Sequence, residues 1–254
     1  MPSRTWTRAA LSSERRRMSG VCWRAVEAQH RVSTMKLVDT LAEQSALELL
    51  VEAAKPPVPP DCQHLHYLLA TPFRYGAAYP SGSRFRRAGL TPGVFYASKT
   101  AATAVAEMTF HRLLFFADSP KTPWPADAGD LTAFSVPFRS AAAIDLTAPP
   151  FDGHRARWTH PTDYAPCQAL ADTAREADVD VLRYPSARDA GGVNLALLAC
   201  RAFAGKAPSE RQTWRLNLNA YGARAVCEHP ELRLEFARDA FAADRRIAEL
   251  QWKR

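Results

Sequence analysis

Three stretches of the chain are expected to form helices, and the first also shows apolar residues at helical spacing. Residues 37–54 (LVDTLAEQSALELLVEAA) mix apolar and acidic positions at this period and stop before two prolines, which cannot continue a helix. A second helix is expected from Thr100, whose hydroxyl can cap its first turn, to about Phe115. A third is expected over residues 164–177.

Short runs rich in β-branched and aromatic residues, separated by Gly, Pro and Ser, predict strands. These runs do not alternate regularly with helices, which argues against a parallel sheet of βαβ units. The pattern therefore predicts an α+β fold of short mixed strands with few helices. The predicted strands are residues 66–71, 93–98, 131–138, 141–147, 179–184, 193–199, 213–220 and 231–236.

Composition divides the chain into three parts. Residues 1–36 are basic, residues 37–60 hold the first helix and a stiff proline-rich connector (PPVPP), and residues 61–254 hold all the predicted strands. The chain has 254 residues, of which 47% are hydrophobic, so the last part is long enough to form one compact domain.

The net charge of +7 belongs almost entirely to the first part. Residues 1–36 contain eight basic and two acidic residues, so the rest of the chain is close to neutral. A basic arm can contact nucleic acid. The alternative is a disordered start, or a start codon placed too early, with Met18 or Met35 as the initiator. We prefer this alternative, and we expect residues 1–34 to be dispensable for any chemistry and direct nucleic-acid binding to be absent.

The cysteines place further limits on the fold. There are five, at positions 22, 62, 167, 200 and 227, and they form no CxxC pair. Neither a disulfide framework nor a zinc site is therefore expected, and free thiols suit a reducing cytoplasm. No apolar run approaches the roughly 20 residues of a membrane span, and no secretory signal is expected.

Several common catalytic motifs are absent from the sequence. It contains no GxxxxGK[ST] or GxGxxG loop, no HExxH and no GxSxG. His64 and His66 alternate along one predicted strand and so face the same side. Two half-buried or surface histidines are a simpler interpretation of this pair than a metal site.

One unit, from Gly82 to Phe110, brings three chemically different groups close together in sequence. Arg84 lies in a glycine-flanked turn, Tyr96 at the end of a predicted strand, and Glu107 in an alanine-rich helix. Each has an ordinary interpretation: a solvated arginine, a core tyrosine and a carboxylate at the edge of the core. On the helix, Thr103, Glu107 and His111 share one stripe.

A second unit, residues 179–198, contains Ser186 directly after a predicted strand. The loop that follows it contains two glycines, and a serine in this position can present its hydroxyl and backbone amide to an anion. A simple turn serine next to Pro185 is the alternative interpretation.

The two units together resemble the RES domain, a family named for an arginine, a glutamate and a serine. Its motifs correspond in order to GSRF (82–85), VFY (94–96), AVAE (104–107) and YPSARDAGGVN (184–194), and PFRY supplies an earlier arginine, Arg74. The resemblance covers about residues 64–225. Many members have Gly-Gly-Arg-Trp-Asn at the first motif, where this chain has Gly-Ser-Arg-Phe-Arg.

The resemblance implies a fold similar to ADP-ribosyltransferases and an enzyme that consumes NAD. Members act as toxins of bacterial toxin–antitoxin pairs, either as NAD phosphorylases or as ADP-ribosyltransferases, and the usual partner is an antitoxin with an Xre-like DNA-binding domain. It implies NAD as substrate and phosphate as the co-substrate, no metal and no other cofactor. The oligomeric state, with a homodimer among the options, is left open.

The same resemblance implies roles for the residues. Glu107 would stabilise the oxocarbenium-like sugar as the nicotinamide–ribose bond breaks. Arg84 would pair with the pyrophosphate as a bidentate donor, and Tyr96 would stack on the nicotinamide or the ribose. Ser186 would bind a phosphate or the incoming nucleophile. Arg74 and Asn194 would be further substrate contacts.

Overall fold

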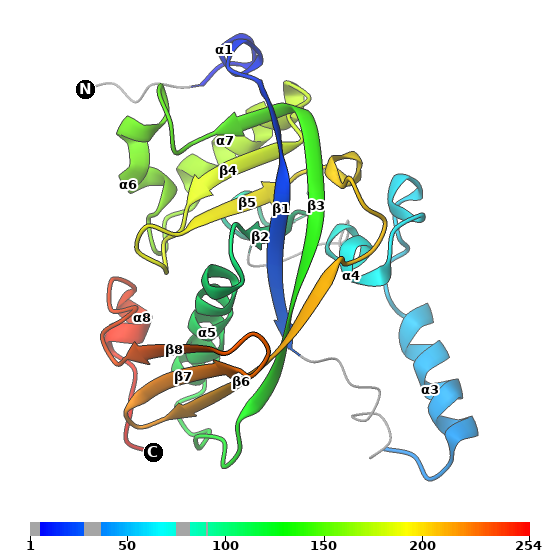
Figure 1. The fold of residues 1–254 in the computed structure, drawn as a ribbon, viewed down its shortest axis with the longest axis vertical. Coiled ribbons are helices and arrows are strands. Elements are labelled where there is room, and N and C mark those ends of the chain that lie inside the picture. Colours follow the sequence, from blue (N-terminus) through cyan, green and yellow to red (C-terminus); the bar gives the residue numbers. More distant parts are fainter. Residues whose placement is uncertain (1–5, 28–36, 75–81, 90) are drawn as a thin grey trace.

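The computed structural model describes residues 6–27, 37–74, 82–89 and 91–254. Its strands form one sheet in the order β1-β2-β5-β4-β3-β6-β7-β8, and a further pairing of β1 with β3 closes five of them into a small barrel (Figure 1). β6, β7 and β8 extend from β3 as an antiparallel sheet. The strands are β1 (Arg16–Glu27), β2 (Phe95–Ser98), β3 (Gly129–Asp145), β4 (Val181–Pro185), β5 (Val193–Leu197), β6 (Glu210–Asn219), β7 (Gly222–Cys227) and β8 (Leu232–Ala237).

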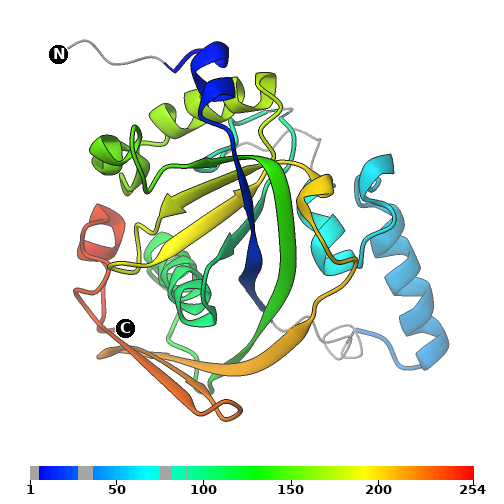
Figure 2. The ribbon, with the colours of Figure 1, turned by 45° about the horizontal axis from the view of Figure 1, so that its top comes forward.

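The helices surround this sheet, except for α5, which lies between the barrel strands and the β6–β8 extension (Figure 2). The α+β class predicted from the sequence is confirmed, although β1 and β3 are longer than the short strands that were expected. The α-helices are α1 (Arg8–Ser13), α3 (Leu41–Ala53), α4 (Tyr67–Ala70), α5 (Ala101–Asp118), α6 (Arg155–Trp158), α7 (Ala165–Glu176) and α8 (Arg245–Ala248), and short 3-10 turns are η1 (Pro60–Cys62), η2 (Thr71–Phe73), η3 (Asp152–His154) and η4 (Cys200–Ala202).

Local signals in the sequence explain where the three main helices begin. Thr40 and Glu43 form a capping box at the start of α3. The Thr100 hydroxyl accepts a hydrogen bond from the Thr103 amide at the start of α5, as predicted. α7 has a proline in its first turn, where a missing amide hydrogen costs little. All three helices lie close to their predicted ranges.

The core consists of three buried clusters that hold these elements together. One contains residues of all five barrel strands, among them Phe95, Phe134 and Leu195. A second packs α5 against β3, β6 and β7 through residues such as Phe110 and Trp214. The third packs α7 against β4 and the turn that follows residue 82. α5 is therefore fixed on several sides, which makes it a rigid support for side chains that point into the space beside it.

The expected disordered arm is wrong for the described part of residues 1–36. Residues 16–27 form β1, which pairs with β3 along its length and meets β2 at Trp23. The positive charges that suggested an arm are used within the fold, since Arg16 lies 3.9 Å from Asp145 and Arg24 donates to the Tyr96 carbonyl. Residues 1–5 and 28–36 of this prediction lie outside the described residues.

Two strand predictions also differ from the structure. Residues 66–71 form α4 and the start of η2, because the His66 side chain accepts a hydrogen bond from the Leu68 amide and caps a helical turn. His64 and His66 therefore do not alternate along a strand. The two runs at 131–138 and 141–147 belong to one long strand, β3, which pairs with β1 and β6 first and with β4 at its end.

The expectation that no disulfide would form is wrong. Cys62 and Cys200, separated by 138 residues, form a disulfide that joins η1 to η4, whereas Cys22, Cys167 and Cys227 are free and buried. Among the described residues, one group of potential metal donors contains Asp61 together with this disulfide pair. No helix in the described part of the chain is both long enough and apolar enough to cross a membrane.

Candidate active site

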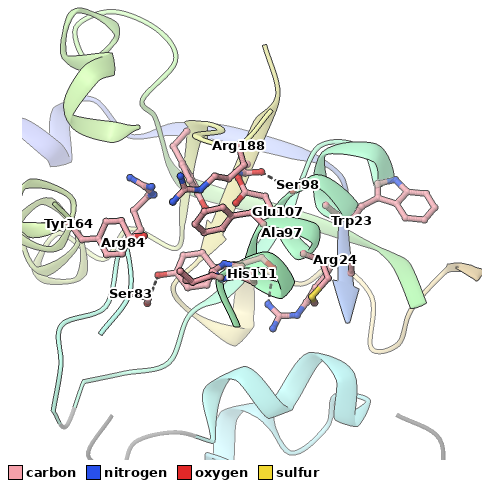
Figure 3. Close-up of a pocket in the computed structure, with 18 of the residues that line it drawn as sticks. Trp23, Arg24, Ser83, Arg84, Ala97, Ser98, Glu107, His111, Tyr164 and Arg188 are labelled. Atoms are coloured by element: carbon pink, nitrogen blue, oxygen red, sulfur yellow. Dashed lines mark hydrogen bonds between the residues drawn. The ribbon is translucent and has the colours of Figure 1, made fainter. Parts of the chain in front are cut away.

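A cavity of about 430 Å³ opens beside α5 and is lined by residues from both ends of the chain (Figure 3). Its volume lies within the range of pockets that hold small molecules, roughly 300–1,000 Å³. The structure brings Arg84, Tyr96, Glu107 and Asn194 together in its wall, as the sequence predicted. The cavity therefore contains the cation, the aromatic ring and the carboxylate of the first sequence unit.

Glu107 is the central group of the cavity, and two neutral side chains hold its carboxylate. Ser186 Oγ donates to Glu107 Oε1 at 2.7 Å, and Asn194 Nδ2 donates to the same oxygen at 2.6 Å. Ser98 Oγ donates in turn to Asn194 Oδ1 at 2.7 Å, because β2 and β5 pair with Ser98 opposite Asn194. This chain of hydrogen bonds fixes the carboxylate, and no arginine in the described part of the chain forms an ion pair with it.

The loop after β4 explains why a serine is needed at position 186. The Ser186 hydroxyl oxygen accepts the backbone amides of Arg188 and Asp189, both at 3.0 Å, so its own proton is directed to Glu107. Thr103 of α5 donates to the Asp189 carboxylate, which ties the loop to the helix. Gly191 has a φ of +82°, a conformation that other residues rarely adopt. Ser186 is buried behind Glu107 and positions it, rather than lining the cavity as a substrate contact.

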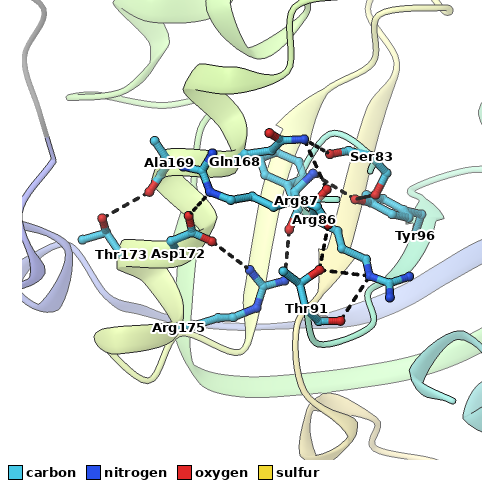
Figure 4. Close-up of polar contacts among 11 residues, drawn as sticks. Ser83, Arg86, Arg87, Thr91, Tyr96, Gln168, Ala169, Asp172, Thr173 and Arg175 are labelled. Atoms are coloured by element: carbon cyan, nitrogen blue, oxygen red, sulfur yellow. Dashed lines mark hydrogen bonds and ion pairs between the residues drawn. The ribbon is translucent and has the colours of Figure 1, made fainter. Parts of the chain in front are cut away.

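The turn that carries Arg84 is fixed from two sides (Figure 4). The Tyr96 hydroxyl accepts the Phe85 amide at 2.9 Å and lies 2.8 Å from Ser83 Oγ. From α7, Gln168 and Arg175 donate to backbone carbonyls of the same turn. Burial raises the pKa of Tyr96, so its hydroxyl remains protonated. Tyr96 therefore lines the cavity, and its hydroxyl holds the turn.

Arg84 enters the cavity next to an aromatic ring. Its guanidinium lies 4.7 Å from the centre of the Tyr164 ring, and Nη1 donates to the Trp158 carbonyl at 2.7 Å. Stacking of this kind fixes the plane of a guanidinium and leaves its other donors available to an anion. Tyr164 was not predicted, because it lies far from the motif in sequence.

The structure does not bring Arg74 into the cavity. Arg74 ends η2 and pairs with Glu52 of α3 at 2.5 Å, and it is absent from the cavity wall. In the described residues it therefore joins α3 to η2. The expected substrate contact at Arg74 has no geometric support here.

Several residues of the cavity wall besides Tyr164 were not predicted as site residues, although His111 was placed on the stripe of Glu107. The run GVCWRAV that contains Trp23 and Arg24 has the residue types of a strand, but the surrounding basic residues obscured this signal. Arg188 lies inside the predicted serine motif. Arg246 comes from α8, and nothing in its local sequence indicates a site. Among them are Trp23, Arg24, His111, Arg188 and Arg246.

Burial and neighbouring charges shape the acid–base properties of this wall. Burial lowers the pKa of Arg24 to about 10, so it remains charged at neutral pH. The His111 side chain is exposed along the cavity, and partial desolvation by the protein around it lowers its pKa. Glu107 opposes the shift, while the charges of Arg188, Arg246 and Arg24 add to it. His111 is therefore neutral at pH 7.

This arrangement can bind an anionic molecule and stabilise positive charge that develops next to Glu107. The carboxylate is held in place before any ligand arrives, which is the property of a preorganised electrostatic site. The arginines near it supply anion contacts, and the rings of Trp23, Tyr96 and Tyr164 supply flat apolar surfaces.

Comparison with known proteins gives a family for the larger part of the chain. A family model described as the RES domain matches residues 58–219. A solved structure of the M. tuberculosis MbcT-MbcA toxin-antitoxin complex is similar, with 17% sequence identity, coverage of 82% of this chain and 92% of that chain, and a TM-score of 0.46. No curated protein matches the chain.

Proposed function

The chain belongs to the RES domain family, and from this membership and the cavity geometry we propose that it cleaves the nicotinamide–ribose bond of NAD with inorganic phosphate as acceptor. The products are nicotinamide and ADP-ribose 1″-phosphate. The electron pair of the broken bond goes to the nicotinamide nitrogen, and a phosphate oxygen forms the new bond to the sugar carbon. The monohydrogen phosphate keeps its proton, so charge and atoms balance without a general base.

The observation that carries this proposal is the carboxylate of Glu107, fixed by Ser186 and Asn194 at 2.7 and 2.6 Å. As the bond to nicotinamide breaks, positive charge develops on the sugar, and a carboxylate already in place lowers the energy of that state. Both of these partners are uncharged, and no cation of the described residues forms a salt bridge with Glu107. The leaving group is cationic in NAD and needs no metal to depart.

The other residues of the cavity wall bind and orient the dinucleotide. Arg84, with its plane set by Tyr164, pairs with the pyrophosphate. The Tyr96 ring packs against the nicotinamide or its ribose. These contacts bring the bond to be broken next to Glu107.

The experiment uses purified full-length protein, NAD and mass spectrometry, with and without phosphate. We expect nicotinamide and ADP-ribose 1″-phosphate when phosphate is present, and little release of nicotinamide without it. ADP-ribose attached to a protein would indicate protein ADP-ribosylation instead. NAD that stays intact under all conditions would overturn the proposal.

We further propose that the protein acts as the toxin of a bacterial toxin–antitoxin pair in the cytoplasm, with an Xre-like antitoxin as partner. Consumption of NAD would itself inhibit growth, and a bound partner that covers the cavity would prevent it. Expression in bacteria, with cellular NAD measured over time, tests this part. Growth inhibition that persists in a Glu107→Gln variant would contradict it.

A further inference from the structure

One row of directly paired residues crosses four strands of the barrel and lines the cavity. Residues that lie opposite each other in neighbouring strands point to the same face of a sheet. Along β1, β2, β5 and β4, the residues of this row are Trp23, Ser98, Asn194 and Tyr184. The row ends at Tyr184, next to Asn194, which donates to the Glu107 carboxylate at 2.6 Å. Tyr184 therefore lies beside a side chain that holds the central carboxylate.

The ring of Tyr184 also contacts the turn that carries Arg84. Its centre lies 4.8 Å from the centre of the Phe85 ring, and the two rings meet edge to face at 74°. Phe85 directly follows Arg84 in the chain and is fully buried. Tyr184 is thus fixed between the residue that holds Glu107 and the turn that presents Arg84.

The Tyr184 hydroxyl has no hydrogen-bond partner among the described residues, although the side chain is only 5% exposed. Buried tyrosines usually pair this group, so an unpaired one calls for an explanation. In the part of the chain that the structure describes, the polar side-chain atoms that are sealed from solvent without a partner belong to Arg74 and Arg175. The Tyr184 hydroxyl is not one of these sealed atoms, so it opens into the cavity that Tyr184 lines.

This hydroxyl keeps its proton and can donate a hydrogen bond into the cavity. Burial raises the pKa of Tyr184 well above its usual value, and the negative charge of Glu107 adds to the shift. A neutral phenol donates one hydrogen bond and contributes no net charge. It therefore suits an uncharged oxygen of a ligand, such as a sugar hydroxyl.

We propose that the Tyr184 hydroxyl donates a hydrogen bond to the 2′- or 3′-hydroxyl oxygen of the nicotinamide ribose and so selects ribose over deoxyribose at this position. This contact rests on the proposed function, in which the reacting sugar carbon lies next to Glu107 and the pyrophosphate pairs with Arg84. The nicotinamide ribose is the part of the dinucleotide that joins these two groups. A site that pairs with a substrate hydroxyl rejects an analogue without it, because the polar group of the protein then loses its partner.

Tyr184→Phe removes the oxygen and keeps the ring that packs against Phe85. Its kcat/KM is compared with that of wild type for NAD and for two analogues, which lack the 2′- or the 3′-hydroxyl of the nicotinamide ribose. The variant should lose about tenfold on NAD, the effect of one hydrogen bond, and should lose nothing on one of the two analogues. Each analogue has the same intrinsic reactivity with both proteins, so this difference isolates the contact. Tyr221→Phe is the matched control, since Tyr221 is 83% exposed and absent from the cavity wall.

A second measurement does not depend on turnover. ADP-ribose contains the ribose in question and ADP lacks it, and each is titrated into the full-length protein by calorimetry. Wild type and Tyr221→Phe should bind ADP-ribose about tenfold more tightly than Tyr184→Phe does, and all three proteins should bind ADP equally. Circular dichroism establishes that each variant is folded. If Tyr184→Phe does not fold, wild type remains a test, because equal affinities for ADP-ribose and ADP would overturn the contact.

The outcomes separate this contact from the proposed function. If wild type leaves NAD intact but its affinity for ADP-ribose depends on Tyr184, the function is wrong and the contact stands. If wild type cleaves NAD and Tyr184→Phe does so with the same kcat/KM, the contact is wrong. Equal losses on NAD and on both analogues would assign Tyr184 to another part of the dinucleotide and would also overturn the contact. If wild type neither cleaves NAD nor binds ADP-ribose, both proposals are wrong.

Discussion

Replacement of Glu107 by glutamine removes one negative charge and little else. Both hydrogen bonds to this side chain reach Oε1, from Ser186 and Asn194, and the oxygen of a glutamine amide can accept the same two. The amide nitrogen then occupies the position of Oε2, to which no side chain in the described residues donates. The helix and the loop should therefore keep their structure, and the loss falls on catalysis.

The size of that loss follows from the preorganised geometry. Removal of one electrostatic stabiliser from a preorganised site raises the barrier by about 2.7–4 kcal/mol, which is a factor of about 100 to 1,000 in rate. We expect kcat for NAD consumption to fall by roughly this factor and thermal stability to stay close to that of wild type. A purely structural glutamate would give the opposite result, a change in stability without a change in rate.

Nicotinamide release, followed by liquid chromatography, measures this rate in parallel with thermal unfolding by circular dichroism. Glu176→Gln is the matched control, since Glu176 is an exposed glutamate at the end of α7 and should behave as wild type. A folded Glu107→Gln protein that consumes NAD at a rate close to wild type would refute both the mechanism and the assignment of the site.

Four further changes test other parts of the argument. Ser186→Ala should lower kcat by about tenfold with little effect on the KM for NAD, because it loosens the carboxylate of Glu107. Arg84→Lys should raise the KM for NAD several-fold although the charge is kept, since an ammonium cannot replace the bidentate fork. Deletion of residues 1–27 should yield insoluble or unfolded protein on expression, because it removes β1 from the barrel. Burial opposes ionisation of Asp145, but hydrogen bonds from neighbouring groups outweigh burial and lower the pKa of Asp145 below the usual 3.8. The ionised carboxylate therefore stabilises the fold above about pH 4, and this contribution is lost as the pH falls further. Asp145→Asn should flatten the acid side of the unfolding-temperature profile.

Local signals in the sequence were sufficient for the elements that depend on local interactions. The start of α5 follows from the Thr100 cap, and α7 follows from its apolar period, because both features act within one or two helical turns. The family motifs placed Glu107 and Ser186 in one site, and the structure joins them by a hydrogen bond. These parts of the fold and site could be predicted.

The errors arose where distant contacts decide the local structure. Residues 66–71 have strand-forming residues, but the cap at His66 and the packing of Leu69 and Phe73 against the barrel favour a helical turn. The pairing of Cys62 with Cys200 depends on a Cα–Cα distance of 5.6 Å between residues that are 138 positions apart. No spacing rule reports such a distance, because the fold itself creates it.

Overall composition misled the prediction for β1 in a way that has a physical explanation. A cluster of arginines usually marks a solvated arm because burial of an unpaired cation is costly. In β1 that cost is reduced by different contacts for each arginine. Arg16 approaches the carboxylate of Asp145. Arg24 donates to a backbone carbonyl beside an aromatic ring and also lines the cavity. The positive charge that made residues 1–36 look separable is therefore part of what the cavity uses to attract an anion. Arg246 reaches the same cavity from the other end of the chain, held by Asp244. The segments outside the family match thus complete the wall of the cavity, and the properties that distinguish this protein from other members should be sought in these two segments.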